Sequence, residues 1–157
     1  MKKIRIYADT SVVGGCFDPE FKEWSNGLLL DFQRGVFQLI LSVLVDAEIQ
    51  GAPDEVKKIY IKFRQSAVEI AELTLESIEL ANAYIEHKIL SPNFINDARH
   101  IAIATVSNAD LLVSWNFHHV VNFEKTLKFN AVNMEMGYKP ILIYSPMEVT
   151  KHGSEGS

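Results

Sequence analysis

Three acidic side chains occupy positions from which they could reach one site. Asp9 directly follows the apolar run 4–8, and Glu48 lies seven residues after the run 37–41. Asp97 lies early in a strongly apolar helical pattern. Open parallel sheets bind ligands at the carboxyl ends of their strands, and the alternation of the chain brings all three acids to that edge. Carboxylates gathered there repel one another, and a divalent cation held by oxygen ligands relieves the repulsion. We therefore expect Mg²⁺ or Mn²⁺ and phosphoryl chemistry, in which the ion activates water.

Each acid also has a purely structural interpretation. Asp9 could cap a turn or the following helix. Glu48 borders the apolar face of its predicted helix and could pair with an Arg or Lys. Asp97 could complement a helix dipole. Asp46 lies about 200° around the same helix from Glu48 and is expected to point to solvent.

Two further polar residues flank the predicted site. Asn116 comes directly after the run 111–114, where a fourth ligand or a water-orienting group is expected. His100 lies three residues beyond Asp97 and could support a metal ligand or contact substrate phosphate. A histidine on an apolar helix is more often part of the core, and that interpretation stays open.

Short apolar runs and longer helical stretches alternate along the chain. The runs are typical of strands buried on both faces: 4–8, 37–41, 111–114, 141–144 and, more weakly, 68–71. The predicted helices cover 19–34, 44–49, 54–65, 74–88 and 92–107. This order predicts an α/β fold, a three-layer α/β/α sandwich around a mostly parallel central sheet of four to five strands.

Length, composition and cysteine content restrict the class of protein. The 157 residues, 48% of them hydrophobic, suit one domain over 1–149, followed by a flexible Gly- and Ser-containing tail over 150–157. A single cysteine, Cys16, excludes an internal disulfide and a cysteine-built zinc site, so a cytoplasmic location is expected. No apolar run is long enough to cross a membrane.

The net charge of -5 argues at first against a nucleic-acid partner. Five glutamates lie between Ser66 and His87 with no Lys or Arg among them, so the remaining 15 acids meet 15 bases. Lys57 and Lys58 follow Glu48 on the next helix and could contact an RNA backbone, although a solvated helix face is the usual role of such lysines. The charge distribution is therefore compatible with RNA binding.

Four segments together resemble the PIN-domain family of metal-dependent ribonucleases, which includes the VapC-type toxins. They are Asp9-Thr10-Ser11, Asp46-Ala47-Glu48-Ile49, Asn96-Asp97-Ala98-Arg99-His100-Ile101-Ala102 and Ala109-Asp110-Leu111-Leu112-Val113-Ser114-Trp115-Asn116. The similarity extends over about residues 3–146, and its order and spacing are more specific than any one segment.

The resemblance implies metal-dependent endonucleolytic hydrolysis of RNA by a homodimer, with an antitoxin protein bound across the groove. Asp9, Glu48 and Asp97 match the metal-binding acids of the family, and Ser11 matches a hydroxyl that supports the site. Many relatives have an Asp near the position of Asn116, so a weaker metal site is expected here.

Two other functions remain open from the sequence. A catalytically inactive module of the same fold would bind RNA or protein without cleaving it. An aspartate phosphotransferase with Asp9 as its nucleophile is less favoured, because Ser11 stands where a haloacid-dehalogenase-type enzyme has a second Asp.

Overall fold

The computed structural model describes residues 2–152, whose strands form one five-stranded sheet. The strands are β1 (Arg5–Ala8), β2 (Gln38–Ser42), β3 (Ala67–Ala71), β4 (Leu111–Val113) and β5 (Leu142–Tyr144). Their order is β3-β2-β1-β4-β5, and every neighbouring pair is parallel. The predicted α/β class is confirmed, including the weak fifth strand.

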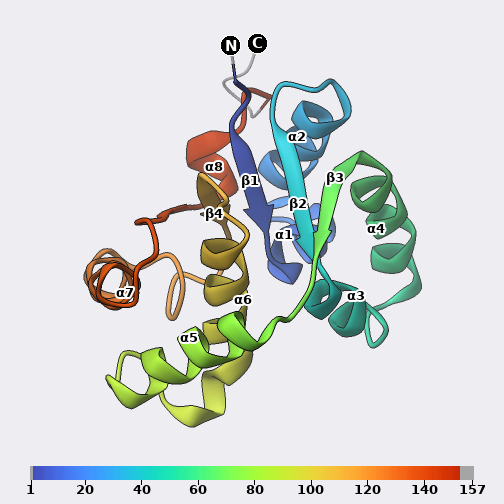
Figure 1. The fold of residues 1–157 in the computed structure, drawn as a ribbon. Helices are drawn as coiled ribbons and strands as arrows, with labels where there is room; N and C mark the ends of the chain where they lie inside the picture. The colour runs from blue at the N-terminus through green and yellow to red at the C-terminus, as the bar shows by residue number, and fades with distance from the viewer. Residues whose placement is uncertain (1, 153–157) are drawn as a thin grey trace.

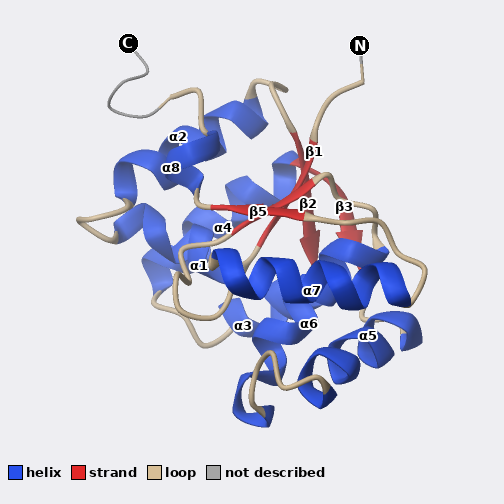
Figure 2. Ribbon diagram, turned by 90° about the vertical axis from the view of Figure 1, so that its left-hand side faces the viewer, coloured by secondary structure: helices blue, strands red, loops and turns tan. Residues whose placement is uncertain are grey.

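Helices cover both faces of this sheet, as Figures 1 and 2 show. One face packs against α1 (Thr10–Gly14), α2 (Lys22–Gln33), α3 (Val43–Ile49) and α4 (Asp54–Ser66). The other packs against α5 (Leu75–Glu86), α6 (Ile95–Val106) and α7 (Phe123–Glu135). Short 3-10 turns at Gly15–Phe17 and Pro92–Phe94 and the helix α8 (Pro146–Val149) complete the fold. No helix within residues 2–152 is long and apolar enough to cross a membrane.

Side chains of β1 alternate between two hydrophobic cores. Ile6 and Ala8 lie among α1 to α4, whereas Tyr7 lies among α5 to α7. All three are fully buried, which explains why the sequence of this strand lacks the polar alternation of a half-exposed strand. Cys16 packs into the first core, and burial raises the pKa of its thiol to about 12, as expected for an unreactive packing residue.

The helix α7 lies in a segment for which the sequence predicted no element. Asn122 caps it by accepting a hydrogen bond from the backbone N–H of Lys125 at 3.0 Å. Phe129 is fully buried, but Phe123 is 78% exposed and Leu127 is 57% exposed. Apolar residues therefore lie around much of the helix, and no single apolar stripe marks it in the sequence.

The end of the described chain is held against α2, contrary to the flexible tail predicted from residue 150. The fully buried Asp31 carboxylate accepts hydrogen bonds from Thr150 Oγ1 at 2.8 Å and from Lys151 N at 2.9 Å, and it pairs with His152. A buried carboxylate needs such donors, and this need explains the order of residues 150–152. The rest of the predicted tail lies outside the described residues.

Candidate functional site

Asp9 lies at the point where β1 ends and α1 begins. Its Oδ1 accepts hydrogen bonds from the backbone N of Ser11 at 3.1 Å and from Ser11 Oγ at 2.5 Å, so the capping role is present. Ser11 Oγ in turn accepts from the backbone N of Trp115 at 2.9 Å. Ser11 therefore ties the residue after β1 to the residues after β4, and it fixes the Asp9 carboxylate between them.

Burial dominates the electrostatics of Asp9. Only 5% of the residue is exposed, and the loss of water raises its pKa above the ordinary value. The charge of His100 and the hydrogen bonds of Ser11 and Ser114 lower the pKa but do not cancel the effect of burial. A buried carboxylate of this kind gains from a nearby cation.

Glu48 reaches across the carboxyl edge of the sheet from α3 to α6. Its Oε1 accepts a hydrogen bond from Thr10 Oγ1 at 2.5 Å and lies 2.6 Å from His100 Nε2. Glu48 does turn inward, as its helical position predicts, but its partner is a histidine instead of an Arg or Lys. Burial alone raises the pKa of Glu48, but the contacts with His100 and Thr10 outweigh it, so the pKa lies below its ordinary value.

A buried chain of hydroxyls extends this contact into the core. His100 Nδ1 lies 2.7 Å from the Tyr7 hydroxyl, which lies 2.8 Å from Ser42 Oγ. An ionised carboxylate only accepts, so His100 Nε2 donates to Glu48. The position of the imidazole is thus set from both sides.

Asp97 lies in the first turn of α6 and contacts Asn116 from the segment after β4. Asn116 Nδ2 donates to Asp97 Oδ2 at 3.3 Å, while Asn116 Oδ1 accepts from the backbone N of His119 at 2.9 Å. Because the His119 N–H requires an oxygen opposite it, the amide group of Asn116 faces Asp97. The predicted role of Asn116 as an oxygen ligand is not what this arrangement shows, since its carbonyl oxygen is engaged in the turn.

The acids influence one another electrostatically. Partial burial and the negative charge of Asp9 raise the pKa of Asp97, and Glu48 adds to this effect. His119 and His100 lower it. Asp97 does not cap α6 with its side chain.

The three acids fit a divalent cation in chemistry, but they do not enclose one as they stand. Their carboxylates are hard oxygen donors, and the repulsion between Asp9 and Asp97 is the kind that a cation relieves. In the part of the chain that the structure describes, no three His, Cys, Asp or Glu side chains are arranged to hold a metal ion. One oxygen of the Glu48 carboxylate is engaged with His100 and Thr10.

The four residues predicted to bind substrate lie in two different parts of the structure. Ser11 contacts Asp9 and His100 contacts Glu48, and His100 is only 4% exposed, so both residues position acids. Lys57 and Lys58 lie in the first turns of α4, with Lys58 exposed, and neither makes an ion pair within residues 2–152.

Sequence reasoning missed Thr10 and Tyr7. A tyrosine in a strand buried on both faces needs a partner for its hydroxyl, and this was the available signal for Tyr7. Asp46 is partly exposed, as its position predicts, but it also pairs with Arg64 at 3.2 Å and accepts a hydrogen bond from Tyr60. These contacts, above all those with Arg64, overcome the effect of partial burial and lower the pKa of Asp46.

Aromatic side chains border the Asn116 side of the site. Trp115 is buried and stacks on Phe21, with ring centroids 4.0 Å apart, while Phe117 beside it is exposed. His119 packs on Phe94 at 3.8 Å. Trp115 thus belongs to the core, and Phe117 and Phe94 form an exposed rim.

No protein-family model matches this chain, and no curated protein matches it significantly in sequence. Among solved structures, it is similar to a chain in the crystal structure of VapBC2 from Rickettsia felis bound to a DNA fragment from their promoter. The identity is 16% and the TM-score 0.58, over 90% of this chain and 98% of that chain. The similarity therefore lies in the fold.

Proposed function

We propose that this protein is a metal-dependent endoribonuclease whose active site contains Asp9, Glu48 and Asp97. The observation that carries the proposal is the convergence of these acids, from the ends of separate elements, on the carboxyl edge of a parallel sheet. The mutual repulsion of Asp9 and Asp97 supports a cation between them. The fold shared with a chain of the VapBC2 structure adds support.

Asp9, Glu48 and Asp97 would hold a Mg²⁺ or Mn²⁺ ion. When bound, such an ion supplies activation of water and neutralisation of phosphodiester charge. The chain itself orients the acids: Ser11 holds Asp9, Thr10 and His100 hold Glu48, and Asn116 holds Asp97. Glu48 and Asp97 keep their places through donors on other elements, and Asp9 through Ser11 in the helix that it caps, which organises the site before substrate arrives.

RNA would approach over the exposed rim. Phe94 and Phe117 offer faces on which unpaired bases can stack, and Lys57 and Lys58 offer phosphate contacts from the α4 side. By analogy with the VapB–VapC complex, we also propose a small antitoxin protein as partner and a homodimer as the working form.

Cleavage assays on acid variants test the assignment. Asp97→Asn and Glu48→Gln should each lower cleavage of structured and unstructured RNAs in Mn²⁺ by about 100-fold, as expected for lost metal ligands. Asp110→Asn, at the opposite edge of the sheet, and the exposed Glu79→Gln are the matched controls and should cleave normally. Equal cleavage by all four variants would exclude this site.

The second candidate is a binding module of the same fold without catalysis. It is favoured by the absence, among residues 2–152, of three side chains arranged to hold a metal ion, and by the engaged carbonyl of Asn116. Calorimetric titration with Mn²⁺ separates the two functions. RNA binding without metal binding at millimolar Mn²⁺ would establish the module.

A further inference from the structure

A hollow of about 850 Å³ lies at the amino edge of the sheet, opposite the acids. It forms where β1 and β4 begin, and its walls include the turn from α6 to β4 and residues just before β5. Pockets for small molecules commonly measure about 300 to 1,000 Å³, so this hollow has the volume for such a ligand. Nothing in the proposed nuclease mechanism uses it.

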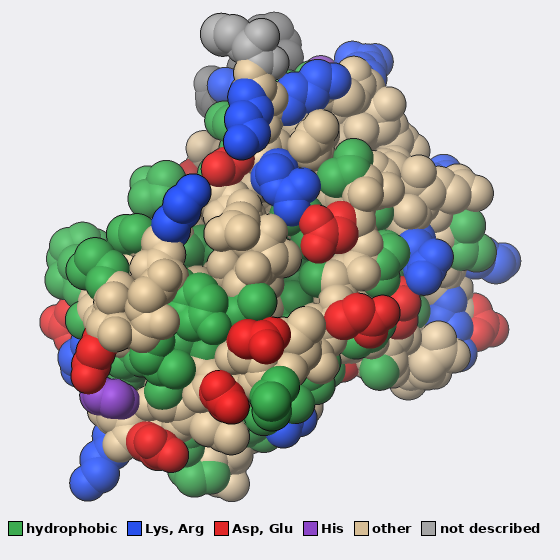
Figure 3. Space-filling model, viewed as in Figure 1, with side chains coloured by type: hydrophobic (Ala, Val, Ile, Leu, Met, Phe, Trp, Pro, Cys, Tyr) green, Lys and Arg blue, Asp and Glu red, His purple; other side chains and the backbone are tan. Residues whose placement is uncertain are grey.

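Positive charge gathers at this end of the molecule. Lys2, Lys3, Arg5 and Lys139 line the hollow, against a single acid, Asp110. Figure 3 shows Lys and Arg side chains over the end where β1 begins, while Asp and Glu side chains dominate the lower half of the same view. The hollow is therefore positive although the whole chain is acidic.

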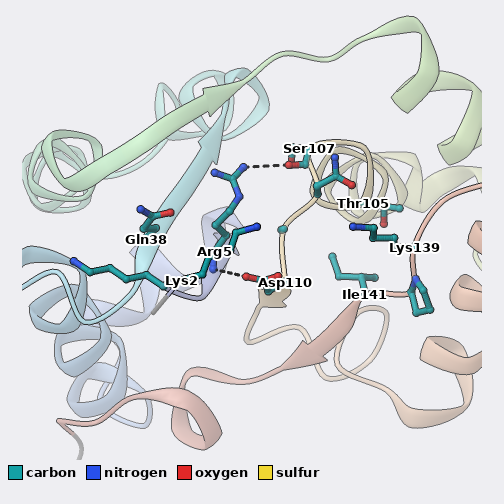
Figure 4. A pocket seen from close by; sticks show the side chains of 12 residues that line it. Lys2, Arg5, Gln38, Thr105, Ser107, Asp110, Lys139 and Ile141 are labelled. Carbon is teal, nitrogen blue, oxygen red and sulfur yellow. Dashed lines mark hydrogen bonds between the residues drawn. The ribbon is translucent and has the colours of Figure 1, made fainter.

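The two charged groups nearest the strand are already engaged. The Arg5 guanidinium donates to Glu69 Oε1 at 2.8 Å and to the backbone oxygen of Ser107 at 3.1 Å, and Asp110 accepts from Arg5 N at 2.8 Å. The dashed lines in Figure 4 mark the contacts of Arg5 with Ser107 and Asp110. These bonds hold the side chains of Arg5 and Asp110 in place at the base of the hollow.

The lysines are not engaged in this way. Within residues 2–152, no ion pair involves Lys2, Lys3 or Lys139. Figure 4 shows Lys2 and Lys139 on opposite sides of Arg5. Ammonium groups on both sides of the base of a hollow can contact one anion together, and charge-assisted hydrogen bonds to phosphate are among the stronger polar contacts.

The rest of the lining suits the less charged part of a ligand. Gln38 and Asn108 carry side-chain amides, and the exposed Pro140 adds apolar surface beside the largely buried Ala109 and Ile141. An inorganic anion would use only the lysines, whereas a nucleotide has phosphates, hydrogen-bonding edges and a flat apolar face. We propose that this hollow binds a phosphorylated small molecule of nucleotide size, with Lys2 and Lys139 as its phosphate contacts.

Titration calorimetry in EDTA with ATP, adenosine and pyrophosphate as probes tests this binding site. ATP should bind, adenosine should not, and pyrophosphate should bind about tenfold more weakly than ATP, because it lacks the amide and apolar contacts. The double variant Lys2→Ala with Lys139→Ala should weaken ATP binding by at least about tenfold. The matched double variant of two exposed lysines outside the hollow, Lys62→Ala with Lys128→Ala, should bind as the wild type does.

Three results would overturn the site: no ATP binding, equal loss in both double variants, or pyrophosphate binding as tight as ATP binding. If the wild type does not bind ATP and the Lys2 and Lys139 double variant is less stable, these lysines have only a structural role, such as interaction with the negative carboxyl end of a helix dipole. Asp97→Asn should leave ATP binding unchanged, so a failure of the nuclease assignment and a failure of this site are separately visible.

Discussion

His100 Nε2 lies 2.6 Å from Glu48 Oε1, joining a buried imidazole on α6 to a carboxylate on α3. The two residues are 52 positions apart in the chain, and the contact crosses the carboxyl edge of the sheet. Tyr7 supports the far side of the ring. The Glu48 carboxylate is therefore positioned by the core itself, through groups that water does not reach.

Removing the Tyr7 hydroxyl should loosen Glu48. Tyr7→Phe leaves the buried His100 Nδ1 without a hydrogen-bond partner and removes one of the two hydrogen bonds of Ser42 Oγ, at a cost of about 1–3 kcal/mol in free energy of unfolding. Cleavage by the folded protein should fall about tenfold, as for groups that support metal ligands. Urea denaturation and RNA cleavage measure the two effects.

Tyr84→Phe is the control for this prediction. Tyr84 is equally buried and belongs to the same core, but its hydroxyl donates to Asn133 and contacts neither His100 nor the acids. It should lower stability to a similar extent without changing cleavage. If both variants lose the same activity per folded molecule, Tyr7 has no positioning role.

Asn116→Asp should convert a donor facing Asp97 into a repelling carboxylate. In EDTA the melting temperature should fall by about 2–4 °C, which corresponds to about 1 kcal/mol for a chain of this size. Saturating Mn²⁺ should raise it more than in the wild type, because an added carboxylate binds the ion more tightly. Asn82→Asp, on the exposed side of α5, should change neither value.

Because the pKa of Asp97 is raised, its ionised carboxylate lowers the free energy of unfolding of the metal-free protein. An acid whose pKa is higher in the folded state adds stability below its unfolded pKa, near 4, and loses that contribution as the pH rises through the folded pKa. Asp97→Asn keeps an acceptor for Asn116 and removes the charge. In EDTA at pH 7 the variant should therefore be more stable than the wild type by about 1 kcal/mol, allowing for solvent screening.

The difference between these two proteins should shrink as the pH falls below 4, where Asp97 is protonated in both states. Urea denaturation at several pH values measures it. A wild type more stable than Asp97→Asn at pH 7 in EDTA would contradict the repulsion assigned to Asp97.

The elements were more predictable than the contacts between them. Strands buried on both faces have continuous apolar sequences, so β1, β2 and β4 were recognisable from local pattern. The alternation of strands and helices predicted a parallel sheet, and a parallel sheet has one carboxyl edge. Asp9, Glu48 and Asp97 lie at that edge, as expected. Local pattern could not predict α7, whose apolar residues are divided between core and surface.

Side-chain partners depend on distances that sequence does not contain. The contacts of His100 with Tyr7 and Glu48 join segments 93 and 52 residues apart. Asn116 matched a site position by spacing, but its amide orientation depends on a turn that only the folded chain shows. Thr10 was visible only as a neighbour of Asp9.

Truncation after Val149 should destabilise the protein. It removes Thr150, Lys151 and His152, all of which contact the Asp31 carboxylate, and leaves a charge with no donors in a poorly hydrated position. The expected cost is about 3 kcal/mol, as for the loss of one side of a buried polar pair. Denaturation of the truncated and full chains measures it.

The variant Asp31→Asn tests whether the charge of Asp31 causes the loss of stability on truncation. In the truncated chain it should restore part of the lost stability, because the buried group no longer carries a charge. In the full chain it should be destabilising, because three donors lose their charged acceptor. Equal stability of the truncated and full chains would mean that residues 150–152 do not anchor Asp31.

Cleavage of a labelled RNA by the wild-type protein, measured from EDTA through rising Mn²⁺ concentrations, tests the central claim most directly. A metal-dependent nuclease should give no cleavage in EDTA and a rate that rises and saturates with Mn²⁺. Asp97→Asn in the same titration should require more Mn²⁺ and reach a lower rate. Cleavage that persists in EDTA, or an identical titration curve for Asp97→Asn, would contradict the account.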